Sequence, residues 1–383
     1  MSTTTGRTPL PHLTGEHDEI RTRIRNQLAD AVLPYADSWE RQRAIDADGW
    51  RALGAHGLLE LAHGGDDFLD SAVLLEELGR TGYAGVRAAV GVHAYMATSY
   101  LRMFGTEEQR ATLLPAVARG ERIAALAISE AGAGTDLRHL STRAEVLGAD
   151  GYRVSGQKYY VANGSRAGFY VTLVKTRETT GSRGLSGASL LVIDADAPGV
   201  THTPQPMTGW HSADVCRVDF DGVLVPANRL IGRRDFALMH LMTGLDFERL
   251  VAGLLAVGGV GYCLELLHRF VREHQVKDVP LAAHQAVRHK VAELTGDFEL
   301  VRNYAYHAAW LHSRGLLDTR TASVLKLKAT ELAVTAAQTC VQYHGARGYL
   351  DDAAASRLYR DAMAGTIAAG ASELLRDMIF ESH

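Results

Sequence analysis

Cysteine is scarce in this sequence, with 3 residues among 383. Cys216, Cys263 and Cys340 lie far apart along the chain and form no Cys-x-x-Cys motif. This spacing argues against a disulfide framework and against a zinc site. We therefore expect reduced thiols, no bound metal and a cytoplasmic protein.

An excess of basic residues is also missing, because the net charge is −4 and the isoelectric point is near 6.5. Nucleic-acid binding depends on clustered Lys and Arg that neutralise phosphates, so no nucleic-acid partner is expected. The N-terminal stretch from Met1 to Pro11 lacks the apolar core of a signal peptide, and residues 1–12 are expected to form a flexible tail.

Uncharged runs are too short for a membrane span. The stretch from Leu250 to Leu264 carries no charge, but it falls short of the roughly 20 residues that a spanning helix needs. It also contains Gly253, Gly258, Gly259 and Gly261. We predict a buried helix whose glycines let neighbouring helices approach closely.

What the sequence does contain is typical of a folded protein of two or three domains, with 46% hydrophobic and 22% charged residues. Helical periodicity dominates residues 13–122 and 236–383. Short runs rich in Val, Tyr and Ile fill residues 123–235, with turn signals at Asp150-Gly151, Asn163-Gly164 and Asp221-Gly222. This order predicts an α+β protein in which helical domains flank an antiparallel β-domain, with a surface loop at residues 181–187.

Glu248 is the most informative residue of the second helical part. A carboxylate among apolar neighbours faces the interior, where desolvation raises its pKa and suits it to general-base chemistry. Arg249 points about 100° away and is expected to pair with Asp246. Taken alone, Glu248 is equally compatible with a structural carboxylate that a distant cation or amide satisfies. Its neighbours at helical spacing are Leu241, Gly244, Leu245, Val251, Ala252, Leu255 and Ala256.

Three other segments are weak signals when taken singly. The first runs from Ser129 to Asp136 (Ser-Glu-Ala-Gly-Ala-Gly-Thr-Asp), where small residues let backbone N–H groups approach a ligand. The second, from Gly156 to Gly164, indicates a β-hairpin. The third combines Gln342 to Tyr349 with Ile367 to Glu373 near the C-terminus. By contrast, Glu76-Glu77 and Glu107-Glu108 are expected on solvated helix faces.

Together and in this order, these segments resemble the acyl-CoA dehydrogenase family, from about Leu13 to the end of the chain. The resemblance implies an N-terminal all-α domain, a central antiparallel β-barrel-like domain and a C-terminal four-helix bundle. It implies FAD as cofactor and a homotetramer or dimer. It also implies α,β-dehydrogenation of an acyl thioester carried by CoA or by an acyl carrier protein. Electrons would pass to electron-transfer flavoprotein or to oxygen.

The resemblance also assigns site residues. Those implied at the cofactor are Leu126, Ile128, Ser129, Tyr160, Ala162, His274, Gln342, Gly345, Ala346, Ala371 and Glu373. Those implied at the substrate are Thr135, Asp136, Leu245, Arg249, Ala368, Ala369 and Gly370. Most members of the family carry the catalytic Glu at the position of Ala369, and alanine accepts no proton. The isovaleryl- and long-chain-type branch instead places this Glu on a helix in a Glu-Arg-Leu context, which Glu248-Arg249-Leu250 matches.

Other positions depart from the family pattern in ways that weaken the expected cofactor contacts. Ala162 replaces a Thr that hydrogen-bonds the flavin, and Tyr160 replaces a Trp beside it. His274 stands where the family has an Arg that reaches the FAD pyrophosphate across a dimer, and histidine is neutral for much of the time at pH 7. Two alternatives therefore remain open: a flavin monooxygenase on the same fold, and a redox-silent thioester-binding or proton-transfer protein.

Overall fold

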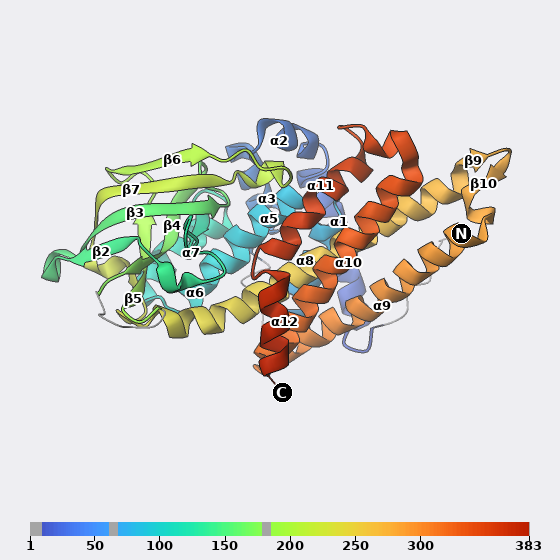
Figure 1. Ribbon diagram of the computed structural model, residues 1–383. Helices are drawn as coiled ribbons and strands as arrows, with labels where there is room; N and C mark the ends of the chain where they lie inside the picture. The colour runs from blue at the N-terminus through green and yellow to red at the C-terminus, as the bar shows by residue number, and fades with distance from the viewer. Residues whose placement is uncertain (1–9, 61–67, 178–184, 383) are drawn as a thin grey trace.

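Along the chain, a β-sheet region lies between two helical regions, in the order that the sequence predicts. In space, the sheet lies at one end of the molecule (Figure 1). The computed structural model describes residues 10–60, 68–177 and 185–382. Most of the predicted loop at 181–187 lies outside these ranges. Leu10 is buried and His12 stacks on Trp310 with 5.2 Å between the ring centroids, so the last residues of the predicted 1–12 tail pack on the helices.

The N-terminal region is helical because its apolar residues recur at helical spacing and its turns carry capping residues. Asp46 accepts a hydrogen bond from the Gly49 N–H at the start of α3, and Thr106 forms a capping box with Gln109 at the start of α7. A π-helical turn, η2 (Gly91–Ala97), joins α5 to α6. The α-helices are α1 (Gly15–Ala31), α2 (Ala36–Gln42), α3 (Ala47–Ala55), α4 (Phe68–Gly79), α5 (Ala84–Val90), α6 (Thr98–Phe104) and α7 (Glu107–Ala118).

The middle region is an eight-stranded sheet with the strand order β6-β7-β3-β2-β4-β5-β8, and β1 pairs with β4. Most neighbours are antiparallel, as predicted, but β1 and β2 both run parallel to β4. Two turn predictions are wrong. Asp221-Gly222 lies inside β7, and Asn163-Gly164 joins strands that do not pair with each other, so the Gly156–Gly164 segment is no hairpin. The strands are β1 (Ile123–Ala127), β2 (Arg143–Val146), β3 (Tyr152–Val161), β4 (Ala167–Lys175), β5 (Ala188–Asp194), β6 (Val200–Pro204), β7 (Cys216–Val225) and β8 (Leu230–Ile231).

The C-terminal region is built around α8, which starts beneath the sheet and ends at the far side of the molecule, beside a small hairpin (Figure 1). By length and composition α8 is apolar enough to cross a membrane, and 78% of its most apolar window is buried inside the protein. The elements are α8 (Ala237–Glu273), β9 (Gln275–Val276), β10 (Val279–Pro280), α9 (Gln285–Ser313), α10 (Thr319–His344), α11 (Ala354–Ile367) and α12 (Ser372–Glu381).

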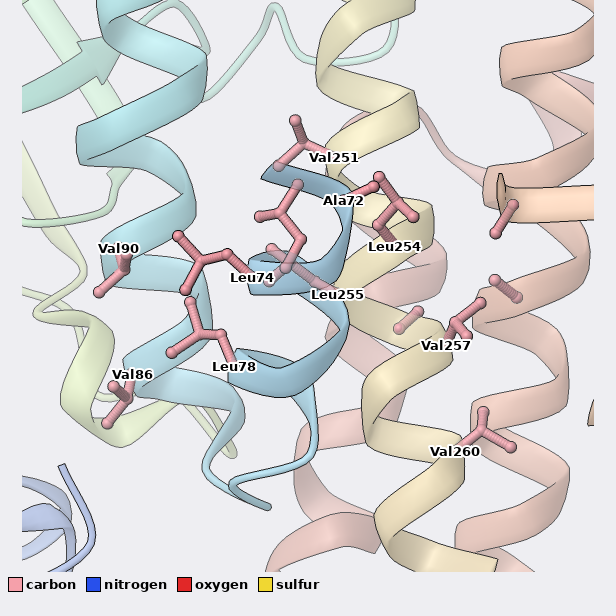
Figure 2. Close-up of a cluster of buried hydrophobic side chains, with 14 of the residues drawn as sticks. Ala72, Leu74, Leu78, Val86, Val90, Val251, Leu254, Leu255, Val257 and Val260 are labelled. Carbon is pink, nitrogen blue, oxygen red and sulfur yellow. The ribbon is translucent and has the colours of Figure 1, made fainter. Parts of the chain in front are cut away.

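Glycines bring α8 against α4, as the sequence predicts. A Cβ added to Gly258 would lie 2.0 Å from the Glu76 carbonyl oxygen, and one added to Gly79 would lie 2.4 Å from the Leu255 carbonyl oxygen. Valine and leucine side chains of α4, α5 and α8 fill the space around this crossing (Figure 2). The two helices are therefore in backbone contact, and α8 is fixed relative to the N-terminal helices.

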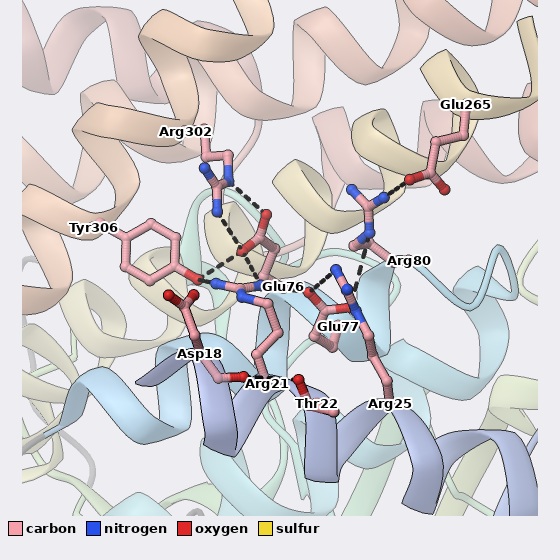
Figure 3. A network of polar contacts seen from close by, with 10 residues as sticks. All are labelled: Asp18, Arg21, Thr22, Arg25, Glu76, Glu77, Arg80, Glu265, Arg302 and Tyr306. Atoms are coloured by element: carbon pink, nitrogen blue, oxygen red, sulfur yellow. Dashed lines mark hydrogen bonds and ion pairs between the residues drawn. The ribbon is translucent and has the colours of Figure 1, made fainter. Parts of the chain in front are cut away.

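The prediction of a solvated face at Glu76-Glu77 is wrong, whereas Glu107 and Glu108 are exposed as expected. Glu76 is fully buried and pairs with Arg21 and Arg302, and it accepts a hydrogen bond from the Tyr306 hydroxyl at 2.6 Å (Figure 3). These contacts join α4 to α1 and α9. A buried carboxylate is tolerated here because cations and a phenol satisfy it from other helices.

Candidate functional site

Glu248 lies in the first half of α8, where its side chain faces the interior and is only 5% exposed. Its Oε1 accepts a 2.6 Å hydrogen bond from the Tyr100 hydroxyl. Burial raises the pKa of Glu248 to about 7, against the opposing effects of the Tyr100 hydrogen bond and the Arg249 charge. The predicted burial and the predicted rise in pKa are therefore confirmed. The hydrogen-bond partner of Glu248 is a phenol, and not the distant cation or amide expected for a structural carboxylate.

Tyr100 reaches Glu248 because α8 carries a glycine one turn before the carboxylate. A Cβ added to Gly244 would lie 2.5 Å from the Tyr100 ring. Tyr100 itself is fully buried on α6, and its hydrogen bond to Glu248 spans 148 residues of sequence. The sequence analysis did not identify Tyr100. Gly244 on the Glu248 face was the available signal that a bulky side chain lies opposite.

Arg249 pairs with Asp246 at 2.7 Å, as predicted. Asp246 also accepts a 2.6 Å hydrogen bond from the Thr319 hydroxyl at the start of α10. Arg249 is 3% exposed, and its Nε has no hydrogen-bond partner among the described residues. Buried polar groups nearly always have a hydrogen-bond partner. This Nε of Arg249, close to the buried carboxylate of Glu248, therefore indicates a place where a ligand binds.

Apolar side chains connect Glu248 to the sheet. Leu245 lies on the same stretch of α8 and packs in one cluster with Tyr100 and Leu241, which also includes Leu126 and Ile128 at the end of β1. Leu245, a predicted substrate residue, and Leu126 and Ile128, two predicted cofactor residues, thus pack on the cluster of Tyr100, which bonds Glu248. An apolar wall with one buried acid is typical of small-molecule sites.

The loop after β1 is fixed by a buried ion pair. Glu130 accepts hydrogen bonds from Lys158 Nζ at 2.9 Å and from the Ser141 and Thr142 N–H groups at 2.7 and 2.9 Å. These donors hold the pKa of Glu130 down to about 2 despite its burial. Lys158 also donates to the Ile128 carbonyl. The backbone around Ile128 and Ser129 is thus held rigidly, without using the side chains expected at the cofactor.

The remaining predicted residues of the sheet lie at its rim. Tyr160 is 60% exposed with φ +59°, and Ala162 is half-buried two residues later. Thr135 is exposed, while Asp136 receives hydrogen bonds from Arg138, which lower the pKa of its carboxyl to about 2. Asp136 therefore already has a partner on the same loop.

The turn between α11 and α12 holds the next group. Ala368, Ala369 and Gly370 are half-buried, and Ala369 adopts φ +53°, a left-handed conformation that costs an alanine about 1–2 kcal/mol. Lys326 of α10 donates a 2.5 Å hydrogen bond to the Gly370 carbonyl. Ala371 precedes α12, and Glu373 is exposed in its first turn. A Cβ on Gly370 would lie 3.8 Å from Arg249 Nε, so this turn adjoins the Glu248 region.

Four predicted cofactor residues lie elsewhere. His274 ends α8 and stacks on Phe270 at 4.8 Å, and Phe270 also stacks on His344. Gln342, Gly345 and Ala346 are exposed at the end of α10. Glu248 and His274 are 26 residues apart on one continuous helix, which at 1.5 Å per residue is about 39 Å. One protomer does not gather all the predicted residues into a single site.

The residues on the sheet side fit a planar flavin. Tyr160 presents an exposed ring, Ser129 keeps a half-buried hydroxyl, and Cβ atoms added to Gly132 or Gly134 would meet nothing within 4 Å. A flat ligand can approach this loop without displacing side chains. His274, which is predicted at the same cofactor, lies at the other end of α8.

Comparisons with known proteins agree with this arrangement. Family models described as the N-terminal, middle and C-terminal domains of acyl-CoA dehydrogenase match residues 14–121, 125–223 and 238–383. The long-chain specific acyl-CoA dehydrogenase of Rattus norvegicus is 30% identical over 371 residues, covering 95% of this chain and 85% of that protein. A 2-methylacyl-CoA dehydrogenase of Solanum tuberosum is also 30% identical, covering 94% and 90%.

Solved structures agree as well. The acyl-CoA dehydrogenase of Geobacillus kaustophilus superposes with a TM-score of 0.91 at 30% identity, covering 98% of this chain and 99% of that one. The prolyl acyl carrier protein oxidase AnaB gives a TM-score of 0.89 at 26% identity, covering 97% and 99%. The chain therefore belongs to the acyl-CoA dehydrogenase family, whose members are FAD-dependent oxidoreductases that act on CH–CH bonds.

Proposed function

We propose that this protein dehydrogenates the α,β bond of an acyl thioester, with Glu248 as the base that removes the α-proton. The observation that carries the proposal is the state of Glu248: it is buried, its pKa is raised to about 7, and its hydrogen-bond partner Tyr100 belongs to the apolar cluster that also includes Leu126 and Ile128. A base with a pKa near the working pH combines a useful ionised fraction with a strong tendency to take a proton. Ala369 offers no competing carboxylate.

The chain's own residues supply positioning and proton transfer. Tyr100 holds Oε1 of Glu248 at 2.6 Å, and Oε2 accepts no hydrogen bond from the residues that the structure describes. Oε2 is thus the oxygen proposed to take the α-proton. Ala369 and Gly370 of the turn present backbone N–H groups for the thioester oxygen, where negative charge develops, whereas the Ala368 N–H donates to the Ala364 carbonyl. FAD, when bound, would supply the acceptor for the β-hydrogen, which would leave as a hydride.

The acyl group and its carrier are part of the proposal. Ala368 and Ala369 leave room beside the thioester, which favours a branched or bulky acyl group over a straight one of equal length. The similarity to a 2-methylacyl-CoA dehydrogenase supports a branched acyl group. The similarity to an acyl carrier protein oxidase supports an acyl carrier protein as a carrier beside CoA. Electron-transfer flavoprotein or oxygen would accept the electrons.

The test is an anaerobic absorbance titration of the FAD-loaded protein with straight and branched acyl thioesters, each as CoA and as carrier-protein derivatives. Loss of the absorbance of oxidised flavin without oxygen supports dehydrogenation. Glu248→Gln keeps the shape of the side chain and removes its basicity, so it should bind FAD and fail to bleach. Bleaching that persists in Glu248→Gln would remove Glu248 from the proposal.

The same titration addresses the two alternatives. A protein that takes up FAD, does not bleach with any thioester, and turns over only in air with an added reductase would be a monooxygenase. A protein that takes up no FAD would be redox-silent. Ala162, which lacks the hydroxyl that the family places at the flavin, is the residue that motivates the monooxygenase alternative.

A further inference from the structure

Lys326 is a buried cation that the proposed reaction does not yet use. It lies in the first third of α10, its side chain is fully buried, and its Nζ donates to the Gly370 carbonyl at 2.5 Å. Buried lysines are usually paired with a carboxylate. The nearest carboxylates that influence it are Glu331 and Glu373, of which Glu331 pairs with Arg376 and Glu373 is exposed. The hydrogen-bond acceptor of Lys326 is therefore a neutral peptide group.

The peptide that Lys326 holds belongs to a strained turn. Ala369 has φ +53° and Gly370 has φ +98°, so two successive residues adopt left-handed backbone conformations. Such a conformation persists at an alanine only where the surroundings enforce it. The Lys326 hydrogen bond ties the turn to α10 across 44 residues of sequence, and it is the interaction in the structure that anchors the Gly370 carbonyl.

Charge around the turn is unbalanced in favour of the cations. Arg249 Nε lies on the other side of Gly370, without a hydrogen-bond partner among the described residues, while Asp246 neutralises the rest of that guanidinium. Burial and the nearby Arg249 lower the pKa of Lys326 to about 8, which leaves it mostly charged at pH 7. The Ser372 hydroxyl, buried just after the turn, has no hydrogen-bond partner within the described part of the chain. Two cations, Lys326 and Arg249, thus adjoin the turn and favour negative charge there.

We propose that Lys326 is a positioning residue, which fixes the Ala369–Gly370 turn against the thioester oxygen and favours negative charge on that oxygen. The proposal rests on the dehydrogenation proposed above. In the step concerned, the substrate Cα–H bond breaks, the proton passes to Glu248, and the electron pair is delocalised onto the thioester oxygen as an enolate. Arg249 adds to the same positive potential. Lys326 contacts neither Glu248 nor the acyl group; it acts through the turn.

The test measures α-proton exchange rather than redox turnover. The probe is the 3-thia analogue of the best thioester from the titration, in which sulfur at the β-position leaves no hydrogen to transfer as hydride. Loss of its α-hydrogens to deuterium oxide, followed by mass spectrometry, reports enolate formation alone. Lys326→Met should slow exchange about 10- to 100-fold, with probe affinity and FAD content changed less than about 3-fold. Lys328→Met, an exposed lysine two residues away, should leave exchange unchanged.

The outcomes separate the two proposals. If wild-type protein exchanges no α-proton and does not bleach with any thioester, the proposed function falls and this one with it. If wild-type exchange is fast and Lys326→Met matches it, the role of Lys326 alone is overturned. If Lys326→Met does not fold, Lys326→Arg provides the test, because arginine keeps the positive charge but not the geometry of the lysine hydrogen bond. Exchange in Lys326→Arg that is at least about 10-fold slower than in the wild type supports the positioning role, and exchange at the wild-type rate refutes it.

Discussion

At the scale of single residues, Tyr100 controls the ionisation of Glu248. Its hydroxyl donates to the carboxylate, which favours the charged form and keeps the pKa of Glu248 lower than burial alone would make it. Tyr100→Phe removes the donor and should raise that pKa by about one unit, since a hydrogen bond to a charged group contributes about 1.5–3 kcal/mol. The rate of flavin reduction by substrate should then rise with pH at a higher midpoint than the wild-type value near 7.

Stopped-flow reduction measured from about pH 5.5 to 9, a range that spans the shifted midpoint, provides the profile. Tyr95→Phe is the matched control, because Tyr95 is another buried tyrosine of the same helical stretch and Tyr100 is the residue that bonds Glu248. An unshifted midpoint in Tyr100→Phe would mean that the carboxylate does not depend on this hydroxyl in solution.

Glu248 should also lower the stability of the folded protein at neutral and alkaline pH. Its folded-state pKa is raised from 4.5 to about 7, so the folded state holds the proton more tightly than the unfolded state does. The free energy of unfolding therefore falls as pH rises from about 4.5 to 7, by up to about 3 kcal/mol. Glu248→Gln has no charge to bury, so its stability relative to wild type should increase over that window.

Urea unfolding of both proteins at about pH 5 and about pH 8, with equal excess FAD, measures the difference, because these values lie near the unfolded-state pKa and above the folded-state pKa of Glu248. A Glu248→Gln advantage that is the same at both pH values would contradict the raised pKa. The comparison needs no substrate, so it tests the electrostatics of the residue separately from its role in the reaction.

The sequence reveals Glu248 but not its partner Tyr100, and the reason is physical. The burial of Glu248 follows from neighbours within eight positions along α8, and helical periodicity makes those visible. Tyr100 and Lys326 act over 148 and 44 residues of sequence, and their contacts depend on how separate helices pack. Glycines such as Gly244 indicate only that something bulky lies opposite.

At the scale of elements, the backbone contact between α4 and α8 should tolerate no side chain. The Cβ of a Gly258→Ala variant would lie 2.0 Å from the Glu76 carbonyl oxygen, so the helices would have to separate. Separation would also disturb Glu76, whose partners come from α1 and α9. We expect Gly258→Ala to lower the free energy of unfolding by about 3 kcal/mol or more.

Gly296→Ala on α9 is the control, because an added Cβ there meets nothing within 4 Å. It should stabilise the protein by about 0.5–1 kcal/mol, the ordinary preference for alanine over glycine in a helix. Chemical denaturation of the two variants and the wild type gives both values. If Gly258→Ala were as stable as Gly296→Ala, the close crossing of α4 and α8 would be wrong.

Element boundaries were predictable where the periodicity is strong, and strand pairing was not. Residues 13–122 and 236–383, which are predicted as helical, hold α1 to α7 and α8 to α12. Asp221-Gly222 and Asn163-Gly164 have the composition of hairpin turns, yet register and strand order are set by contacts between distant strands, such as β3 with β7. Glu76-Glu77 was misplaced on the surface for the same reason, since its cations come from Arg21 and Arg302 on other helices.

At the scale of the whole molecule, the predicted cofactor residues divide between two ends of one chain. Leu126 and Ile128 belong to the apolar cluster of Tyr100, the partner of Glu248, whereas His274 lies about 39 Å from Glu248 along α8. Figure 1 shows the sheet and the β9–β10 hairpin on opposite sides of the molecule. If both groups bind FAD, as the family resemblance implies, each site combines residues from two copies. Binding of FAD and association of the chains should therefore be linked.

His274 makes this linkage testable. In a dimer or tetramer, His274 of one copy would lie near the FAD of its neighbour and donate a hydrogen bond to the pyrophosphate, so His274→Ala should weaken FAD binding by about 10-fold. His274→Arg supplies a permanent charge and a planar donor for phosphate, and should strengthen FAD binding.

Flavin fluorescence titration gives the dissociation constants, and light scattering on the same samples gives the mass relative to the 41.5 kDa chain. His284→Ala, which alters another histidine near the β9–β10 hairpin, is the control. Equal affinities in all variants, or tight FAD binding by a 41.5 kDa monomer, would show that one copy completes its own site.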